Sequence, residues 1–417
     1  MQWYCFLLYG TAAGTVFHKV FFSQTGNGTT ALILSYMSFA IGYIAGPFGA
    51  VFFGHIGDRK GRKVTMYASL LMMGISTSII GILPPAASAG VGVVIVLQLM
   101  RLAQCFGRGG TWGGGILMAY ENVPENKRSF YAAIPQIGLP IGFGLSSILI
   151  AVPTLLLPED IFFTWGWRIP FLAAIILTVI VIRQKGEMME TEDYKKAQAK
   201  LEAEEAEGKK HKVGFIPMVK GYWKTLLLGC GTRWVDGTFY NIFIVWILSY
   251  CINWLGMPLI QTYIITIIAC IFKIPFTLFG GWCAQKLGNT RTFVIGALAS
   301  AVLSIPTLKV IELSKGNLAI TIIGIVLGWS IAYNLIWAVI SSLWSSYFET
   351  EVRYSGISFV YHVPSFLVAG MVPTICTLLI NYGKGDTIYV GIYSTVVALI
   401  SAACALALKA RHDRGEK

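Results

Sequence analysis

Residues 54–63 read GHIGDRKGRK, a basic segment with glycines that stands between two long apolar runs. The runs, residues 31–53 and 64–84, each have about the length that crosses a bilayer core as a helix. The short segment that joins them carries four Lys or Arg side chains. This arrangement indicates two membrane spans connected by a short loop on one side of a bilayer.

The same pattern extends over the rest of the 417 residues, of which 55% are hydrophobic and 12% are charged. This charge content is about half of what soluble domains usually have, which argues against a water-soluble protein. We predict an all-α membrane protein with twelve transmembrane helices. The predicted spans are 2–20, 31–53, 64–84, 92–118, 129–152, 164–182, 225–252, 260–284, 292–309, 318–346, 355–380 and 388–408.

The distribution of basic residues predicts the orientation of these spans. One set of loops holds 23 of the 32 Lys and Arg residues, whereas the opposite loops and span ends offer Lys19, Lys309, Lys315 and Lys384. By the positive-inside rule the first set and both termini are cytoplasmic, in a multi-pass protein of the cytoplasmic (inner) membrane. The net charge of +12 then mostly reflects the basic loops that set the orientation of the chain in the membrane. We therefore expect no nucleic-acid partner.

The residues that support enzymatic or metal chemistry do not form recognisable sites. All eight cysteines fall within predicted spans, and no Cys/His cluster has the spacing of metal ligands, so we expect neither disulfides, nor metals, nor cofactors. FGRGG (106–110) lacks the Gly-Lys-Ser/Thr ending of a nucleotide loop, and no nucleophile–base pair indicates an enzyme. No cleavable signal peptide is evident in the first apolar run.

Residues 183–224 interrupt the membrane pattern with a helix-prone segment that holds ten basic and eight acidic residues. We expect a solvated, amphipathic helix on the cytoplasmic face; a partner-binding segment is the alternative. The segment separates six spans from six. The expected domains are therefore an N-terminal six-helix bundle (1–182), a cytoplasmic linker (183–224) and a C-terminal six-helix bundle (225–417).

The two halves also repeat a motif. FGHIGDRKGRK (53–63) follows the second span, and GGWCAQKLGNTR (280–291) follows the eighth, with glycines, polar residues and bases in a similar frame. Repeated six-helix units are typical of transporters that work by alternating access, with a binding site near the midplane between the halves.

GHIGDRKGRK closely resembles the signature loop of the major facilitator superfamily. The resemblance implies a conformational latch in which the Asp bonds across to a neighbouring helix end and the basic residues hold the cytoplasmic side in one conformation. A carboxylate suits a helix N-terminus and guanidinium groups suit C-terminal carbonyls. A merely topogenic basic loop is the alternative. The latch residues that the resemblance implies are Gly54, Asp58, Arg59, Gly61 and Arg62.

Five further segments narrow the resemblance to the metabolite:proton symporter branch, whose members include shikimate, 2-oxoglutarate, citrate and proline/betaine carriers. The resemblance covers essentially the whole chain and implies two pseudo-symmetric six-helix bundles. The segments are WYCFLLYGTAAGTVFHKVFF (3–22), MRLAQCFGRGGTWGGG (100–115), ENVPENKRSFYAAIPQIG (121–138), TWGWRIPF (164–171) and VRYSGISFVYH (352–362).

The chain departs from the branch mainly at intramembrane charged positions. Cys5 and Thr111 stand where the branch usually has acids, and Gly46 stands where it has an arginine. Such departures place the usual proton coupling of the branch in question. The full set comprises Cys5, Gly46, Cys105, Arg108, Thr111, Gln285, Asn289 and His362.

Ionisable groups deep in membrane spans are costly, so they are functional candidates by default. Four such cations accompany one clear mid-span acid, which leaves the cavity net positive. This balance favours an anionic substrate, most simply a carboxylate held by arginine forks. The ionisable candidates are Arg101, Arg108, Arg233, Asp236, Lys273 and His362, whereas Arg168 near a span end is expected to be structural.

The fourth span has two different faces on a helical wheel. One face combines polar residues with an aromatic residue and is expected to line the central cavity, while small residues on the other face predict a packing seam. The cavity face carries Arg101, Gln104, Cys105, Arg108 and Trp112. The seam carries Ala103, Gly107, Gly110 and Gly114.

Three further points concern the second half and the aromatic residues. Arg233 and Asp236 stand three residues apart and can pair on one helix, either as site residues or as an internal ion pair. Lys273 either lines the cavity or snorkels toward the surface. The aromatic candidates for the site wall are Tyr9, Trp112 and Tyr240.

The expected function is secondary active transport of a small organic acid, shikimate-like or dicarboxylate-like, with proton coupling. Arg101 and Arg233 would bind the carboxylate, and Asp236 or His362 would exchange the proton, since imidazole titrates near neutral pH. The expected partners are this anion, protons and the lipid bilayer, with the chain as a monomer. The alternatives are a zwitterionic proline or betaine symporter, an uncoupled anion uniporter or exchanger, and a non-transporting membrane sensor.

Overall fold

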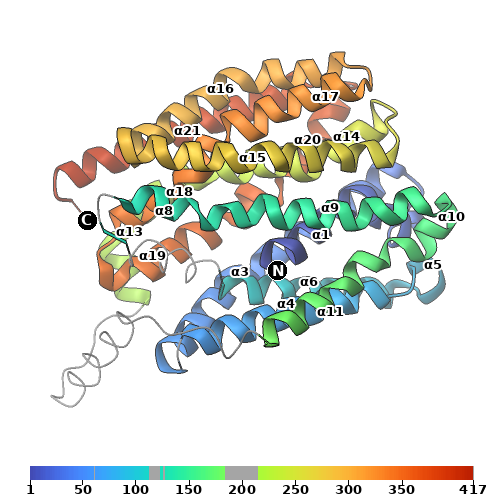
Figure 1. The fold of residues 1–417 in the computed structure, drawn as a ribbon, viewed down its shortest axis with the longest axis horizontal. Helices are drawn as coiled ribbons and strands as arrows, with labels where there is room; N and C mark the ends of the chain where they lie inside the picture. The colour runs from blue at the N-terminus through green and yellow to red at the C-terminus, as the bar shows by residue number, and fades with distance from the viewer. Residues whose placement is uncertain (61, 112–122, 125–126, 184–214, 417) are drawn as a thin grey trace.

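The structure, a computed structural model, describes residues 1–60, 62–111, 123–124, 127–183 and 215–416. Helices run side by side along the long axis of an elongated bundle (Figure 1), and no strand occurs among the residues described. The expected all-α class is therefore confirmed. We call the end at which α13 begins and the C terminus lies the linker end (Figure 1). The opposite end, with α5 and α10, is the distal end (Figure 1).

The first half of the chain runs from α1 to α11. The N terminus itself lies about midway along the bundle in Figure 1. The elements are α1 (Gln2–Thr15), α2 (Phe17–Val20), η1 (Ser23–Thr25), α3 (Gly28–Lys60), α4 (Arg62–Ile82), α5 (Ala86–Ala89), α6 (Val91–Gly109), α8 (Arg128–Ala133), η3 (Pro135–Ile137), α9 (Gly138–Leu156), α10 (Glu159–Ile161), η4 (Phe162–Gly166) and α11 (Arg168–Arg183).

The second half contains three π-helical segments, η6, η7 and η8, each in the middle of a span. Such segments often mark functional sites in helices. The elements are α13 (Phe215–Asn241), η6 (Ile242–Trp246), α14 (Ile247–Asn253), α15 (Leu259–Leu287), α16 (Asn289–Leu313), α17 (Leu318–Ile325), η7 (Val326–Ala332), α18 (Asn334–Tyr347), α19 (Thr350–His362), η8 (Phe366–Gly370), α20 (Val372–Tyr382) and α21 (Ile388–Asp413).

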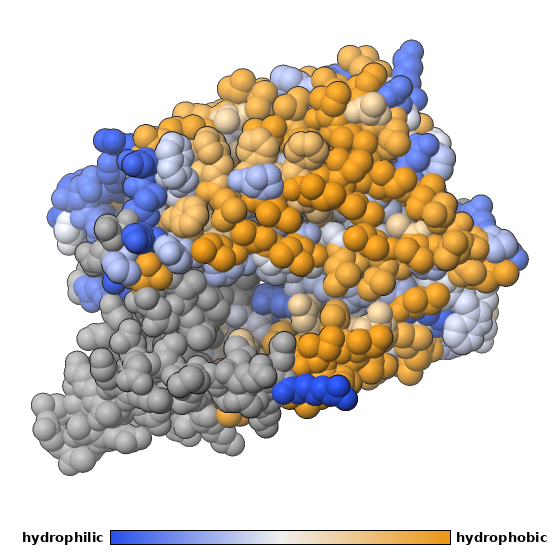
Figure 2. Space-filling model, viewed as in Figure 1, coloured by the Kyte–Doolittle hydropathy of each residue, from blue (hydrophilic) through white to orange (hydrophobic). Residues whose placement is uncertain are grey.

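Most of the predicted membrane spans correspond to helices of sufficient length and hydropathy. Ten helices in the described residues meet this criterion, and an eleventh span is the bent pair 355–362 and 366–382. The remaining predicted span, 2–20, is occupied by α1 and α2, which a break at Val16 divides. Figure 2 shows apolar side chains over the middle of the visible face and polar side chains at its two ends. This surface suits a multi-pass membrane protein.

Two predicted boundaries change in the structure. Helix α13 begins at Phe215, so the last part of the predicted linker is helical and continues into the seventh span after a kink at Tyr222. Helix α6 ends at Gly109 and is followed by a turn at Gly110 and Thr111, whereas residues 112–118 of the predicted fourth span lie outside the described residues. Residues 184–214, with the predicted amphipathic helix, lie outside the described residues.

Two glycines of the predicted packing seam, Gly107 and Gly110, lie close against neighbouring helices, and Gly114 lies outside the described residues. A β-carbon on Gly107 would lie 2.7 Å from the carbonyl oxygen of Ser69 in α4. On a neighbouring face, a β-carbon on Gly109 would lie 2.5 Å from the carbonyl oxygen of Gly46 in α3. Glycine thus lets α6 approach both helices closely, and this approach carries the arginines of α6 into the interior.

Gly109→Ala should therefore destabilise the protein by about 1–3 kcal/mol, because the added methyl group meets backbone atoms that cannot move independently. The measurement is the melting temperature of purified variants in detergent. Gly92→Ala is the matched control in the same helix, since a β-carbon on Gly92 meets nothing within 4 Å. Equal melting temperatures for the two variants would contradict the close α3–α6 packing.

Contacts between the two halves occur at both ends of the bundle. Toward the distal end, Tyr36 of α3 shares a 2.5 Å hydrogen bond with Ser249 of α14. Toward the linker end, the indole of Trp337 donates to the carbonyl oxygen of Gln136 at 3.1 Å. Gln285, one of the departures from the branch, accepts from the backbone N–H of Phe130 at 3.4 Å. The two halves therefore contact each other on both sides of the middle of the bundle.

Candidate functional site

The ionisable residues expected in the spans gather in the interior, where the two halves of the chain meet. They come from α6 in the first half and from α13, α15 and α19 in the second. All are buried, with exposed fractions of 4% or less. Apart from Arg168 near the distal end, the buried ionisable Arg, Lys, His and acidic residues among those described are Arg101, Arg108, Arg233, Asp236, Lys273 and His362.

Arg101 lies in an aromatic enclosure formed by α1 and α3. The carbon at the centre of its guanidinium group lies 4.3 Å from the ring centroid of Tyr9 and 4.5 Å from that of Phe6. The group donates a hydrogen bond to Gln104, which in turn donates to Thr77 at 2.7 Å. Since Gln104 stands one turn further along α6, the helix itself fixes the orientation of Arg101.

Arg108 lies at the boundary between the halves and contacts both. Its guanidinium group lies 3.7 Å from the ring centroid of Phe6 in α1 and 5.8 Å from that of Tyr43 in α3. From the second half, the hydroxyl of Tyr361 in α19 accepts a hydrogen bond from it. Phe6 therefore contacts both Arg101 and Arg108. Tyr361 connects Arg108 to the second half of the chain.

Arg233 and Asp236 form the ion pair that their spacing predicts. They lie on successive turns of α13, and the guanidinium group of Arg233 donates to one carboxylate oxygen of Asp236. The hydroxyl of Tyr333 donates to the other carboxylate oxygen. Arg233 also lies 4.4 Å from the ring centroid of Tyr361, so Tyr361 is shared by two arginines. Asp236 is the one buried acid among the described residues, and both of its carboxylate oxygens are thus engaged.

Lys273 lies beside Tyr333, the tyrosine that donates a hydrogen bond to Asp236. Its ammonium group donates to the side-chain oxygen of Asn334 at 2.9 Å and lies 4.4 Å from the Tyr333 ring centroid. The amide of Asn334 donates back to the Lys273 carbonyl at 2.8 Å. Because Lys273 is fully buried and held in this way, it does not snorkel to the surface.

The His362 ring lies against Gly46 of α3, where a larger residue would meet the ring. A β-carbon on Gly46 of α3 would lie 2.8 Å from the Nδ1 atom of His362 at the end of α19. The His362 ring packs edge to face against Tyr361, with 4.9 Å between centroids. Gly46 and His362 are both departures from the branch pattern, and the structure brings them into contact.

The most informative feature of the centre is a set of buried polar atoms without hydrogen-bond partners among the described residues. They include the Nε–H groups of all three central arginines and two tyrosine hydroxyls. Buried polar groups normally find partners, and each unpaired one costs free energy. All but one of these atoms are donors or hydroxyls that can donate. The set comprises Arg101 Nε, Arg108 Nε, Arg233 Nε, Tyr43 Oη, Tyr240 Oη and His362 Nε2.

Of the other predicted residues, some lie at this centre and some lie outside the described part of the chain. Tyr9 contacts Arg101, and Tyr240 packs near Trp3, which also lies beside Arg108. Trp112 and Gly61 lie outside the described residues, as do the side chains of Asp58, Arg59 and Arg62. Gly54 lies within α3, near its linker-end terminus.

Arg168 has the structural role that its position suggested. Its guanidinium group donates to the carbonyl oxygens of Gly81 and Leu83 at the distal end of α4, the first at 3.0 Å. Its Nε–H donates to the Thr164 carbonyl at 3.0 Å. It therefore satisfies carbonyl groups that a helix C-terminus leaves unpaired.

Sequence reasoning missed several residues that complete the centre. Asn334 was detectable, because it is a polar residue within the otherwise apolar stretch 331–340. Tyr333, Tyr43 and Phe6 carried no such signal, since aromatic residues are frequent throughout the spans. Their roles depend on which helices meet, and helix periodicity does not contain that information.

Comparison with a family profile gives one match over most of the chain. The profile described as Major Facilitator Superfamily matches residues 4–373.

Comparison with curated proteins gives relatives of nearly full length. The chain is 34% identical over 420 residues to the inner membrane metabolite transport protein YhjE of Escherichia coli, covering 99% of this chain and 92% of the relative. It is 31% identical over 416 residues to the shikimate transporter of Escherichia coli, covering 98% and 92%. The proline/betaine transporter of Salmonella typhimurium is 27% identical over 416 residues, covering 99% and 82%.

Solved structures of a xylose transporter share the fold. The Escherichia coli protein XylE in complex with 6-bromo-6-deoxy-D-glucose aligns with a TM-score of 0.74 at 16% identity, covering 97% of this chain and 93% of that chain. The partially occluded, inward-open form of the same transporter aligns with a TM-score of 0.71 at 15% identity, covering 97% and 94%. At this identity the likeness concerns the fold alone.

Proposed function

The chain belongs to the major facilitator superfamily, and from that premise we propose that it carries a small organic anion across the inner membrane by alternating access, coupled to protons. It is a multi-pass membrane protein and a secondary transporter of metabolites, not an enzyme. The proposed substrate is a carboxylate, shikimate-like or dicarboxylate-like. We propose the domains predicted above, with both termini in the cytoplasm. Because the C terminus lies at the linker end, the distal end would then lie outside the cytoplasm. The proposed carrier acts as a monomer.

The unpartnered donors of the centre are the observation that supports an anionic substrate. Arg101, Arg108 and Arg233 each retain an Nε–H without an acceptor, and Asp236 is the one acidic side chain among the buried ionisable groups described. Carboxylate oxygens are acceptors only, and charge-assisted bonds to guanidinium groups are among the strongest in proteins. A bound carboxylate would supply the acceptors that the centre lacks and offset its positive charge.

The aromatic residues around Arg108 give the site its walls. Trp3, Phe6 and Tyr43 surround the guanidinium group from the first half, and Tyr361 closes it from the second. Tyr9 and Gln104 contact the guanidinium group of Arg101. Tyr240 contributes a hydroxyl that has no hydrogen-bond partner among the described residues. We assign substrate binding to Arg101, Gln104, Arg108, Arg233, Tyr9, Trp112, Tyr240 and Lys273.

The contacts of the two proton-coupling candidates differ. Asp236 is held by Arg233 and Tyr333, whereas His362 Nε2 has no partner among the residues described. The charged groups around His362 are Arg108 and Arg233, and Tyr361 lies against its ring. Because both arginines repel an added positive charge, an anion bound between them would favour protonation of His362. Anion and proton would then bind together, which is the linkage that symport requires.

The test is uptake of shikimate and succinate into proteoliposomes under an imposed pH gradient, acidic outside. We expect the gradient to drive accumulation in the wild type. In His362→Gln, whose amide stays polar but does not exchange a proton near neutral pH, we expect gradient-driven accumulation to fall while exchange of substrate for substrate continues. Accumulation that ignores the gradient in the wild type would overturn the coupling and leave a uniporter or exchanger.

A zwitterionic osmolyte is the second candidate, because proline/betaine transporters are among the relatives. A quaternary ammonium group binds against aromatic faces. Around Phe6 and Tyr43 those faces are already occupied by the guanidinium group of Arg108. Glycine betaine should therefore fail to compete with shikimate or succinate for uptake. Binding of a ligand without flux would instead indicate a membrane sensor.

A further inference from the structure

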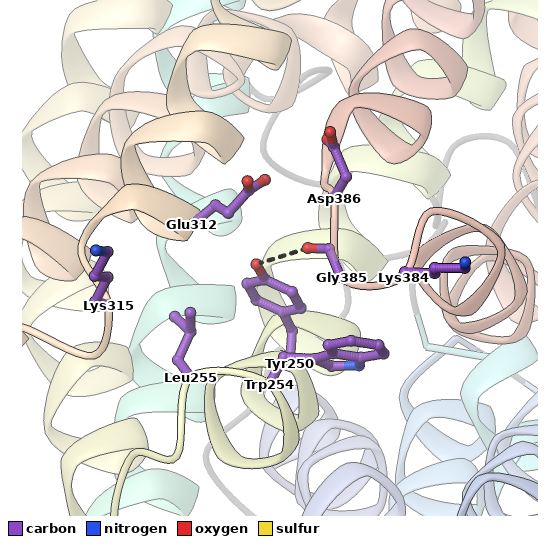
Figure 3. Close-up of a pocket in the computed structure, with 8 residues that line it drawn as sticks. All are labelled: Tyr250, Trp254, Leu255, Glu312, Lys315, Lys384, Gly385 and Asp386. Carbon is purple, nitrogen blue, oxygen red and sulfur yellow. Dashed lines mark hydrogen bonds between the residues drawn. The ribbon is translucent and has the colours of Figure 1, made fainter.

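The second half of the chain contains a separate pocket at the distal end, remote from the charged centre. Its volume is about 480 Å³, a size that accommodates a small metabolite. The pocket lies between α14, the turn that joins α16 to α17, and the turn that joins α20 to α21 (Figure 3). It combines two aromatic side chains, two acids and two lysines.

The two acids of the pocket are already occupied by groups of the protein. The ammonium group of Lys309 donates to Glu312 at 3.0 Å and to Asp386 at 2.7 Å. Glu312 also accepts from the backbone N–H of Thr387 at 2.8 Å, and Asp386 accepts from that of Ile388 at 2.7 Å. The bond from Lys309, followed by that from Ile388, lowers the pKa of Asp386 below its ordinary value.

This network leaves no place for a free metal cation. The ammonium group of Lys309 lies between the two carboxylates, at the position that such a cation would occupy. Because the pKa of Asp386 is lowered, its carboxylate stays ionised throughout the neutral pH range, and Lys309 stays bound there. The acids thus have a structural role and connect α16 to the start of α21.

The two lysines differ from the acids in both backbone and partners. Lys315 has φ of 48° and Lys384 has φ of 51°, and they are the only non-glycine residues with positive φ in the described part of the chain. Each is followed by a glycine, Gly316 or Gly385, that also has positive φ. A residue with a β-carbon adopts this conformation at a cost that glycine avoids. Both costly positions line the same pocket.

The lysine side chains are exposed, and neither makes an ion pair or hydrogen bond with any described residue. Figure 3 shows them on opposite sides of Glu312, Tyr250 and Asp386, and the Lys384 side chain extends away from these residues. With Lys309 included, three cations accompany two acids here. The pocket margin therefore carries a net positive charge.

The inner wall of the pocket is aromatic and held in place. Tyr250 stacks on Trp246 with 5.2 Å between centroids, and its hydroxyl donates to the Gly385 carbonyl at 3.4 Å. Trp254 packs against Gly385, where a β-carbon would lie 2.8 Å from the indole ring. These contacts provide a fixed apolar surface between two exposed charges.

We propose that this pocket is an outer capture site for a small organic carboxylate, in which Lys315 and Lys384 attract the anion and Tyr250 and Trp254 contact its carbon skeleton. The proposal rests on the proposed anion transport, because the captured molecule is the one that the centre then takes up. Surface charges of this kind raise the local substrate concentration and the association rate, and salt weakens the effect.

The test compares Lys315→Gln, Lys384→Gln and the double variant in proteoliposomes of phosphatidylcholine, which exclude anionic lipid headgroups as competing ligands. The probes are radiolabelled shikimate and succinate, at low and at high potassium chloride. At low salt we expect the double variant to raise KM about three- to tenfold with kcat unchanged, and high salt to abolish the difference. Lys315→Arg and Lys384→Arg should restore the wild-type KM.

Two controls separate this effect from misfolding and from failure of the proposed function. Lys220→Gln removes an exposed lysine near the start of α13, at the linker end, and should leave KM unchanged at either salt concentration. If the wild type transports neither probe, the proposed function fails and the capture site with it. If the wild type transports a probe and the double variant keeps its KM at low salt, the capture site alone is wrong.

Discussion

Replacement of Arg108 by glutamine is expected to lower uptake of the anionic substrate about 10- to 100-fold. This range corresponds to the loss of one charged hydrogen bond, about 1.5–3 kcal/mol. Arg108 contacts both halves of the chain, through Phe6 and Tyr361, and its Nε–H has no acceptor. Initial rates of uptake at several substrate concentrations measure the effect.

The melting temperature distinguishes this loss of function from unfolding. Arg108 is 3% exposed, and no acidic side chain is paired with it among the described residues. Removing its charge should therefore leave the melting temperature unchanged or raise it. Arg183→Gln, at the exposed end of α11, is the control and should keep wild-type uptake. Wild-type uptake in Arg108→Gln would show that this arginine does not meet the substrate.

Replacement of Asp236 by asparagine should destabilise the protein by about 3–5 kcal/mol, the usual cost of removing one partner of a buried ion pair. Asp236 is 1% exposed, and it is bonded by Arg233 and by Tyr333. Without its charge, the centre keeps four cations and no acid. The measurement is thermal unfolding of the purified variant in detergent.

The double variant Arg233→Met with Asp236→Leu provides the matched comparison. Buried ion pairs replaced by apolar residues of similar volume often regain the lost stability. We expect the double variant to melt well above Asp236→Asn, even though it should not transport. If Asp236→Asn melts like the wild type, Asp236 does not compensate Arg233 in the folded protein.

Helical periodicity in the sequence predicts the parts of the site that lie on one helix. The pairs Arg233–Asp236 and Arg101–Gln104 are each three residues apart, and both are bonded as this spacing allows. The glycine seam of α6 follows from the same periodicity. Hydropathy likewise predicts most of the spans, because length and apolar composition suffice to cross a bilayer.

The contacts between helices could not be predicted in this way. Arg108 and Tyr361 are 253 positions apart, and their contact depends on how α6 and α19 pack. The partner of Lys273 is Asn334, 61 positions away. The residues next to Lys273 in the sequence therefore could not show that its side chain is buried and does not snorkel. The break at Val16 and the π-helical segments η6 and η7 also contain no proline or polar run that would mark them in the sequence, whereas Pro364 stands just before η8.

The arginine-rich centre is expected to bind a carboxylate. The most direct measurement is the thermal stability of the purified protein in detergent with shikimate and with its neutral carboxamide, each at the same concentration. A ligand that binds only the folded state raises the melting temperature. We predict that shikimate, or succinate in the same assay, stabilises the wild type, that the carboxamide does not, and that Arg108→Gln abolishes the shift. Stabilisation by glycine betaine or by the carboxamide, with no effect of either carboxylate, would contradict the account.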